Sequence, residues 1–198
     1  APILPGGGSA EARGLTVLVL GGSQGARSIN RAMVAALPAL VAAHSGLRVV
    51  HQTGERDWEE VTLAYRACSC IQAEAVPFLY DMPRAFRQAD LIVSRSGATT
   101  VAEITACGKP AVLIPFPHAV HGHQERNARV LERAGAAQVI VDARLSGDVL
   151  ANAISALLAR PDRLREMERC SKSLGQGDAA ERIVSECRAL VQDVTRST

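Results

Sequence analysis

Six short apolar runs alternate with longer segments of helical character, and this alternation limits the possible folds more than any other feature. The apolar runs are residues 16–20, 48–52, 71–76, 91–94, 111–115 and 138–141. The helical segments lie around residues 25–43, 55–67, 81–89, 99–107 and 123–134. Strands that alternate with helices are joined by right-handed crossovers, and uniformly apolar strands belong to a parallel sheet that is covered on both faces. The sequence therefore predicts a doubly wound, Rossmann-like α/β fold with a parallel sheet.

The segments after Val141 predict additional helices at the C-terminal end. Residues 145–170 and 177–194 have no strong strand character and read as a run of helices. Ser146 and Asp178 are suitable N-caps, and Pro161 stands where a helix can begin. We expect these helices to pack after the last strand.

The first 14 residues, APILPGGGSAEARG, have the composition of a linker. They are rich in proline and glycine and contain no initiator Met, which is typical of a segment between domains. Residues 15–198 are long enough for one large domain with its own core. We therefore expect a linker over residues 1–14, one domain over residues 15–198, and a further domain in a larger protein.

Composition and charge exclude several classes of protein. The net charge of +2 is spread over interleaved Arg and Glu residues, so no nucleic-acid partner is expected. The longest apolar runs, such as residues 110–117, are shorter than the ~18 residues of a membrane span, and the chain is expected to be cytoplasmic. Five Cys without a CxxC pair indicate reduced thiols. No metal and no cofactor are expected.

Ligands of parallel sheets bind at the carboxyl ends of the strands, and the loop after residues 16–20 is glycine-rich. It reads GGSQGARSIN over residues 21–30, and its glycines allow a tight turn in front of a helix whose free N–H groups suit a phosphate. Leu20 breaks the dinucleotide fingerprint GxGxxG, and no Lys follows to complete a P-loop. The alternative is a turn in which the glycines serve packing alone.

The loop after residues 91–94 combines a helix start with an acidic residue, in the stretch SRSGATTVAEI (residues 94–104). The N–H groups of Gly97, Ala98 and Thr99 and the positive end of the helix dipole suit an anion. Glu103 shares a helical face with Thr100 and is able to accept hydrogen bonds from vicinal hydroxyls, such as those of a ribose. The alternative is that Thr100 and Glu103 form a capping box.

The loop over residues 115–128, PFPHAVHGHQERNA, contains three His within six residues. Their spacing and the lack of a neighbouring Asp or Cys make a metal site the weaker interpretation. His123, Gln124 and Asn127 suit sugar hydroxyls, which donate and accept hydrogen bonds. The alternative is that Gln124 and Asn127 cap the following helix. No GxSxG motif and no hydrolytic carboxylate pair is present, so no self-contained catalytic centre is predicted.

These loops, together with FLYDM (residues 78–82) and ERAGAA (residues 132–137), follow one another in a distinctive order and spacing. From about Leu15 to its end, the chain resembles the C-terminal half of the bacterial MurG glycosyltransferase family. The resemblance implies a GT-B fold of two Rossmann-like domains, of which this one holds the donor UDP-N-acetylglucosamine. It also implies inverting transfer of N-acetylglucosamine to lipid I, which gives lipid II.

The resemblance assigns roles to particular residues. The diphosphate would meet Gly22, Ser23 and Gln24, and the phosphate and sugar would lie along Gly97, Ala98, Thr99 and Thr100. Glu103 would take the ribose hydroxyls. Phe78 and Leu79 would border the uracil, with hydrogen bonds from the Leu79 backbone, and the sugar hydroxyls would meet His123, Gln124 and Asn127.

Two departures from the family pattern bear on this assignment. Many relatives carry Asp or Asn before the His-Gln pair, where this chain has His121 and Gly122. The N-terminal domain that binds the acceptor and supplies the catalytic base is absent from these residues. The chain alone is therefore expected to bind the donor without turnover, and the full-length protein to lie peripherally at the cytoplasmic face of the membrane.

Two other functions stay open on the sequence. The first is a stand-alone donor-binding subunit that recruits a separate acceptor subunit. The second is an independent NAD-binding Rossmann domain, which needs an acidic residue after the second strand, where this chain has HQT (residues 51–53).

Overall fold

A computed structural model describes residues 14–22, 26–68, 72–177 and 179–196 of the chain. Its centre is a six-stranded, fully parallel sheet of order β3-β2-β1-β4-β5-β6. The strands are β1 (Thr16–Leu20), β2 (Arg48–Gln52), β3 (Gln72–Val76), β4 (Leu91–Ser94), β5 (Ala111–Leu113) and β6 (Ala137–Val139). Each predicted apolar run forms a strand, which confirms the doubly wound α/β fold.

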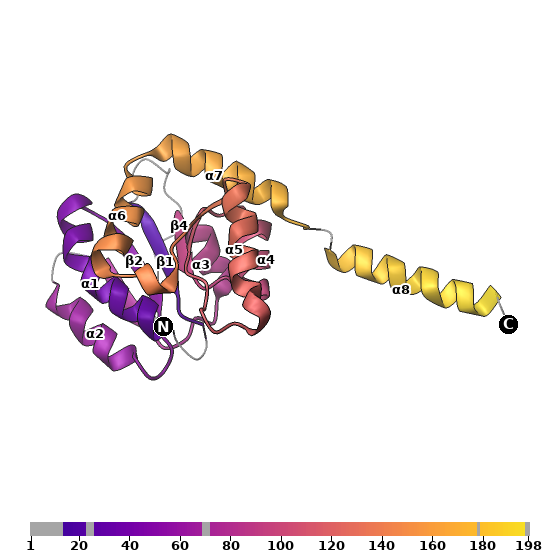
Figure 1. Cartoon of the computed structure of the whole chain (residues 1–198), viewed down its shortest axis with the longest axis horizontal. Coiled ribbons are helices and arrows are strands. Elements are labelled where there is room, and N and C mark those ends of the chain that lie inside the picture. The colour runs from indigo at the N-terminus through magenta and orange to yellow at the C-terminus, as the bar shows by residue number, and fades with distance from the viewer. Residues whose placement is uncertain (1–13, 23–25, 69–71, 178, 197–198) are drawn as a thin grey trace.

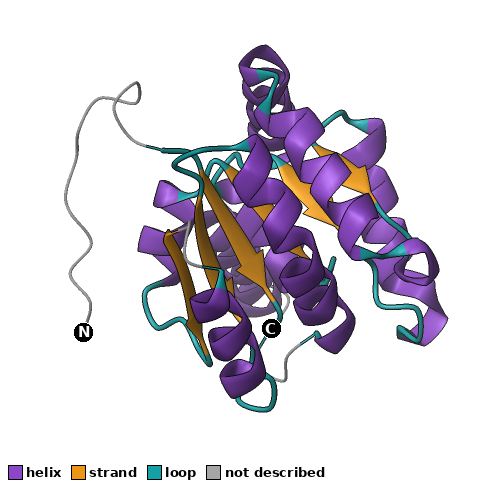
Figure 2. Ribbon diagram, turned by 90° about the vertical axis from the view of Figure 1, so that its left-hand side faces the viewer, coloured by secondary structure: helices purple, strands orange, loops and turns teal. Residues whose placement is uncertain are grey.

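Helices cover both faces of this sheet, as Figure 2 shows. One face carries α1 (Arg27–Ala43), α2 (Trp58–Ala67) and α6 (Gly147–Leu158). The other face carries α3 (Met82–Gln88), α4 (Ala98–Ala106) and α5 (His123–Arg133). Two short 3-10 turns, η1 (Val120–Gly122) and η2 (Asp142–Arg144), precede α5 and α6.

The core consists of two hydrophobic clusters, one on each side of the sheet. Val17 and Val19 pack into the cluster under α1 and α6, whereas Leu18 and Leu20 pack into the cluster under α3, α4 and α5. Successive side chains of a strand point to opposite faces, so a strand buried on both faces is apolar at every position. This is why the inner strands β1, β4 and β5 read as nearly continuous apolar runs.

The strand order places the carboxyl ends of β1 and β4 side by side. Leu20 pairs with Ser94, although 74 residues separate them along the chain. The chain winds outward from β1 through β2 to β3 and then returns to the other side of β1 as β4. Ligands of open α/β sheets bind in the crevice at such a reversal. The loops after β1 and β4 therefore meet at the expected place for a site.

The C-terminal helices extend beyond the last strand. α7 (Pro161–Leu174) spans the two clusters, because Leu164 and Met167 belong to the first whereas Cys170 and Leu174 pack against the second. α8 (Ala179–Arg196) extends away from the rest of the molecule in Figure 1.

The two helix starts predicted after the last strand are confirmed where they are described. Ser146 caps α6, since its Oγ accepts a hydrogen bond from the Val149 N–H at 3.2 Å. Pro161 is the first residue of α7. The third predicted signal, Asp178, lies outside the described residues.

Candidate functional site

The described part of the loop after β1 contains Gly21 and Gly22, and these two differ in the space that is available for a side chain. A Cβ on Gly21 would lie 2.8 Å from the Gln52 carbonyl oxygen and 3.0 Å from the Ala26 nitrogen. Gly22 has a φ of +75° and nothing within 4 Å of its Cβ position. Packing thus requires glycine at position 21, whereas no described residue fills the space beside Gly22. Ser23 and Gln24 lie outside the described residues.

The loop after β4 leads directly into α4. Gly97 is the N-cap, and the helix begins at Ala98 with no side-chain cap. The N–H groups of Ala98, Thr99 and Thr100 therefore have no acceptor within the helix, and the positive end of the helix dipole lies with them. Ala98 and Thr99 are exposed. These three N–H groups form the amide cradle of the site.

The structure contradicts the capping-box interpretation of Thr100 and Glu103. Thr100 is the third residue of α4 and not its N-cap, and no side chain caps this helix. Glu103 lies one turn deeper and is half-buried, and its carboxylate has no hydrogen bond or ion pair with any residue that the structure describes. A carboxylate without an internal partner, beside free N–H groups, is able to accept hydrogen bonds from a ligand.

The start of α5 is tied to the loops after β4 and β5. The Gln124 Oε1 accepts from the Phe116 N–H at 3.0 Å, and the Asn127 Nδ2 donates to the Ser96 carbonyl at 3.1 Å. Ser96 in turn donates from its Oγ to the Gln124 carbonyl at 2.8 Å. Gly122 is the N-cap of α5 and no side chain caps the helix, so the interpretation of Gln124 and Asn127 as caps is wrong. The Gln124 Nε2 remains as a donor for a ligand.

The three His of this loop do not converge on one point. The His123 ring donates from Nδ1 to the Val120 carbonyl at 2.7 Å, because a carbonyl only accepts, and this leaves Nε2 as an acceptor. His121 has left-handed backbone angles, φ 53° and ψ 20°. His118 packs edge-on against Phe116. Among the described residues, no group of three or more His, Cys, Asp or Glu is placed to hold a metal ion.

Phe78 and Leu79 line a groove of about 350 Å³ between α3 and the face of β1, β2 and β3. Phe78 is exposed and Leu79 packs against the core. The Leu79 N–H, which the family resemblance assigned to the uracil, donates to the Gln52 Oε1 at 3.3 Å. A ligand that takes this N–H must displace the Gln52 side chain.

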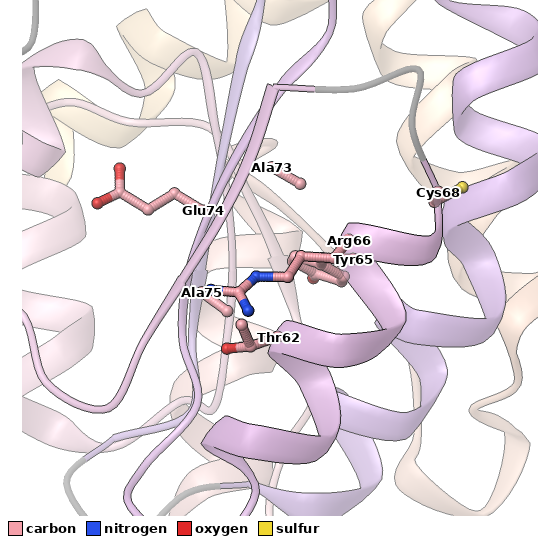
Figure 3. Close-up of a pocket in the computed structure, with 7 residues that line it drawn as sticks. All are labelled: Thr62, Tyr65, Arg66, Cys68, Ala73, Glu74 and Ala75. Carbon is pink, nitrogen blue, oxygen red and sulfur yellow. The ribbon is translucent and has the colours of Figure 1, made fainter.

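A different hollow, of about 380 Å³, lies between α2 and the edge strand β3 (Figure 3). Thr62, Tyr65 and Arg66 line it from α2, whereas Glu74 points toward the opposite face of the sheet. None of the predicted site residues lines this hollow.

A buried polar network beneath the β1–α1 loop was missed on the sequence. His51 is fully buried, and its ring contacts the Tyr65 hydroxyl through Nδ1 at 2.7 Å and the Asn30 Oδ1 through Nε2 at 3.0 Å. The amide oxygen of Asn30 only accepts, so Nε2 carries the proton and Nδ1 accepts from Tyr65. The Asn30 Nδ2 donates to the Thr53 carbonyl at 2.9 Å and to the Asp57 Oδ2 at 2.8 Å. Every polar group of His51 and Asn30 is thus paired.

Arg95 was also missed on the sequence, although it directly follows Ser94 in the stretch SRSGATTVAEI (residues 94–104). Its guanidinium binds groups from three segments: the first turn of α1, the loop after β5, and η2. The sequence signal is a cation immediately after a buried strand. Its partners were not foreseeable, because they lie 19 to 67 residues away along the chain.

No helix of the described residues is long and apolar enough to cross a membrane.

Comparison of the sequence with known proteins shows similarity to one family of glycosyltransferases. The sequence model of the glycosyltransferase family 28 C-terminal domain matches residues 16–183. The chain is 45% identical over 178 residues to the UDP-N-acetylglucosamine--N-acetylmuramyl-(pentapeptide) pyrophosphoryl-undecaprenol N-acetylglucosamine transferase of Thermodesulfovibrio yellowstonii, covering 90% of this chain and 48% of that protein. It is 51% identical over 170 residues to the protein of the same name from Geobacter sulfurreducens, covering 86% of this chain and 46% of that protein.

A solved structure shows the same relationship. The crystal structure of Acinetobacter baumannii MurG is similar with a TM-score of 0.81 and 32% identity, over 90% of this chain and 50% of that chain. The chain thus spans about half the length of the curated relatives that it matches. Because the family model covers most of its residues, the chain belongs to the glycosyltransferase family 28 C-terminal domain family.

Proposed function

We propose that the chain is the donor-binding half of an inverting glycosyltransferase that transfers N-acetylglucosamine from UDP-N-acetylglucosamine to lipid I, which gives lipid II. The names of the relatives at 45% and 51% identity support this activity. The observation that carries the proposal for this chain is Glu103, a half-buried carboxylate one turn below the amide cradle that has no hydrogen bond or ion pair with the described part of the chain.

The amide cradle supplies the electrostatics that this reaction needs. The muramyl 4-hydroxyl attacks the anomeric carbon of the sugar, the bond to the diphosphate breaks, and negative charge develops on UDP as it leaves. N–H groups and a helix dipole that are fixed in advance stabilise such charge without reorganisation. The base that takes the hydroxyl proton belongs to the N-terminal part of the full-length protein, so the chain alone binds the donor and does not transfer it.

The other predicted donor contacts belong to the same proposal. Ser23 and Gln24 complete the diphosphate site, Glu103 holds the ribose, and Phe78 and Leu79 border the uracil. His123 and Gln124 bind sugar hydroxyls, with a His Nε2 acceptor beside a Gln Nε2 donor. Asn127 acts through Ser96, to which it is hydrogen-bonded. In the full-length protein, the site lies at the cytoplasmic face of the membrane, where lipid I is the acceptor.

An NAD-binding function is not favoured by the geometry. A dinucleotide domain needs a free carboxylate after the second strand to bind the ribose hydroxyls. β2 ends at Gln52 and is followed by Thr53 and Gly54, so no carboxylate stands directly at the end of this strand, and Asp57 further on accepts from the Asn30 Nδ2 at 2.8 Å. NADH fluorescence titration without a response is the expected result.

Isothermal calorimetry with UDP-N-acetylglucosamine tests the proposal. The unmodified chain should bind, and Glu103→Ala should lose about 1 to 3 kcal/mol of binding free energy, as for a hydrogen bond to a charged group. Glu59→Gln, an exposed first-turn residue of α2, is the matched control and should bind as the unmodified chain does. No heat at millimolar donor, or an unchanged affinity of Glu103→Ala, contradicts the proposal.

A further inference from the structure

We propose that Arg95 is a positioning residue for donor binding, anchored by Asp142, and that it fixes the loops after β1, β4 and β5 relative to one another. The inference deepens the proposed function and rests on it, because it concerns how the same site is held in shape.

The guanidinium of Arg95 is the centre of a dense set of hydrogen bonds. Its Nη1 donates to the carbonyls of Ile114 and Pro115, at 3.1 Å each, and pairs with the Asp142 Oδ1 at 2.5 Å. Its Nη2 donates to the Ser28 Oγ at 2.8 Å. Ser28 donates in turn to the Asp142 Oδ1 at 2.8 Å, which closes the set. One side chain thus joins the loop after β5, η2 and the first turn of α1.

Arg95 is not free to act as a counter-ion for the diphosphate. Its side chain is 18% exposed and that of Asp142 is 20% exposed, so the pair is largely shielded from water. The guanidinium also lies 5.4 Å from the centroid of the Phe116 ring, which covers it from one side. Since both terminal nitrogens already have acceptors and a carboxylate balances the charge, a ligand phosphate would have to compete with Asp142.

The amide cradle begins three residues after Arg95, and the residue between Arg95 and Gly97 is also held by hydrogen bonds. Ser96, the next residue, donates to the Gln124 carbonyl, and its own carbonyl accepts from Asn127. Gln124 accepts from the Phe116 N–H on the loop after β5. The cradle begins two residues after Ser96, so both residues that precede Gly97 are hydrogen-bonded to other loops. Binding groups held within a fraction of an ångström in advance bind more tightly than loose ones.

The experiment compares four variants of the full chain: Arg95→Met, Asp142→Asn, the double variant that carries both changes, and the control Arg48→Met. Arg48 is a matched control, because it makes a partly shielded pair with Glu74 at 3.9 Å and is the first residue of β2, so it lies at the amino ends of the strands and away from the site. Calorimetry measures the affinity for UDP-N-acetylglucosamine. Hydrogen exchange on the free protein measures the order of residues 96–100 and 114–124.

Arg95→Met and Asp142→Asn should each weaken donor binding by about tenfold or more and speed exchange in both segments, whereas Arg48→Met changes neither. The double variant should weaken binding no more than the worse single variant, since both remove the same arrangement. If Arg95 instead contacts the diphosphate, Asp142→Asn frees the guanidinium and leaves affinity unchanged or raises it, which overturns the proposal.

The exchange measurement separates this inference from the proposed function. Unchanged exchange in Arg95→Met overturns the positioning role whether or not the donor binds. Faster exchange with an unchanged affinity overturns its link to binding. Failure of the unmodified chain to bind the donor contradicts the proposed function and removes the binding part of this inference with it, while the exchange result still decides whether Arg95 fixes the loops.

Discussion

His51 shows at the scale of one residue how burial sets the charge of a side chain. It is 0% exposed, and burial lowers its pKa from 6.5 to about 3. The folded protein thus holds the neutral ring, whereas the unfolded chain takes up a proton below about pH 6.5. The contribution of His51 to stability is complete above about pH 6.5 and is lost as the pH falls toward 3.

We expect the free energy of unfolding to fall by about 1.4 kcal/mol per pH unit below pH 6.5 because of His51 alone, or roughly 2 kcal/mol at pH 5. Urea denaturation at pH 7.5, 6.5 and 5 measures this. His51→Gln is the control: it is less stable at pH 7.5, because it disturbs the bonds to Tyr65 and Asn30, but it has a shallower pH dependence. Equal slopes for both proteins would show that His51 does not titrate as burial predicts.

Gly21 and Gly97 require glycine for different reasons: packing requires it at position 21, whereas ligand binding is expected to require it at position 97. A Cβ at Gly21 meets backbone atoms at 2.8 and 3.0 Å, so Gly21→Ala should lose about 1 to 3 kcal/mol of stability. A Cβ at Gly97 meets nothing within 4 Å, and its φ of −62° suits any residue.

Gly97→Ala should therefore lose only about 1 kcal/mol of stability or less, the difference between two N-cap residues. Its methyl group enters the space beside the amide cradle, and so the affinity for the proposed donor, UDP-N-acetylglucosamine, should fall. Thermal melting and calorimetry on both variants provide the comparison. A Gly97→Ala protein that binds the donor normally would place the diphosphate elsewhere.

At the scale of elements, the apolar runs predicted which segments form strands but not the residues at which the strands end. β5 and β6 were expected over residues 111–115 and 138–141 and end at Leu113 and Val139. The Ile114 N–H still donates to the Ser94 carbonyl at 2.8 Å, but the carbonyls of Ile114 and Pro115 accept from the Arg95 guanidinium and not from a neighbouring strand. A distant side chain decides this boundary, and local sequence does not contain that information.

The same lack of local information explains why the capping-box interpretation of Thr100 and Glu103 in α4 was wrong. The pattern Thr-x-x-Glu fits a capping box wherever it occurs, and the N-cap position decides its meaning. Gly97 takes that position because the chain leaves β4 extended and turns there. The candidate site was thus predictable as a set of loops and a helix start. The roles of Gln124 and Asn127 as ties between loops required the structure.

The cap of α6 is a testable local feature. The Ser146 Oγ accepts the Val149 N–H, so Ser146→Ala should cost about 1 kcal/mol of stability. Asn152→Ala, at an exposed interior position of the same helix, is the control, and it should be neutral or slightly stabilising, because Ala is the better helix former. Urea denaturation measures the free energy of unfolding of both variants. Equal effects of the two changes would show that the Ser146 cap does not stabilise α6.

At the scale of the whole molecule, the two last helices differ in how they attach. α7 buries Leu164 and Met167 in the core under α1 and α6, and Ser171 donates to the Ile104 carbonyl at 3.3 Å. α8 extends away from the sheet (Figure 1), and its residues from Glu181 to Arg188 are exposed. Helices draw most of their stability in proteins from packing of an apolar face.

A chain that ends after Gly175 should therefore unfold at the same urea concentration as the complete one, since it loses no buried side chain of the described core. A chain that ends after Ala159 also loses Leu164 and Met167, and burial of two such side chains contributes about 3 to 6 kcal/mol. It should be strongly destabilised. Far-UV circular dichroism during denaturation compares the three chains. A large loss from removal of α8 alone would mean that this helix packs against the domain in solution, contrary to its extended position.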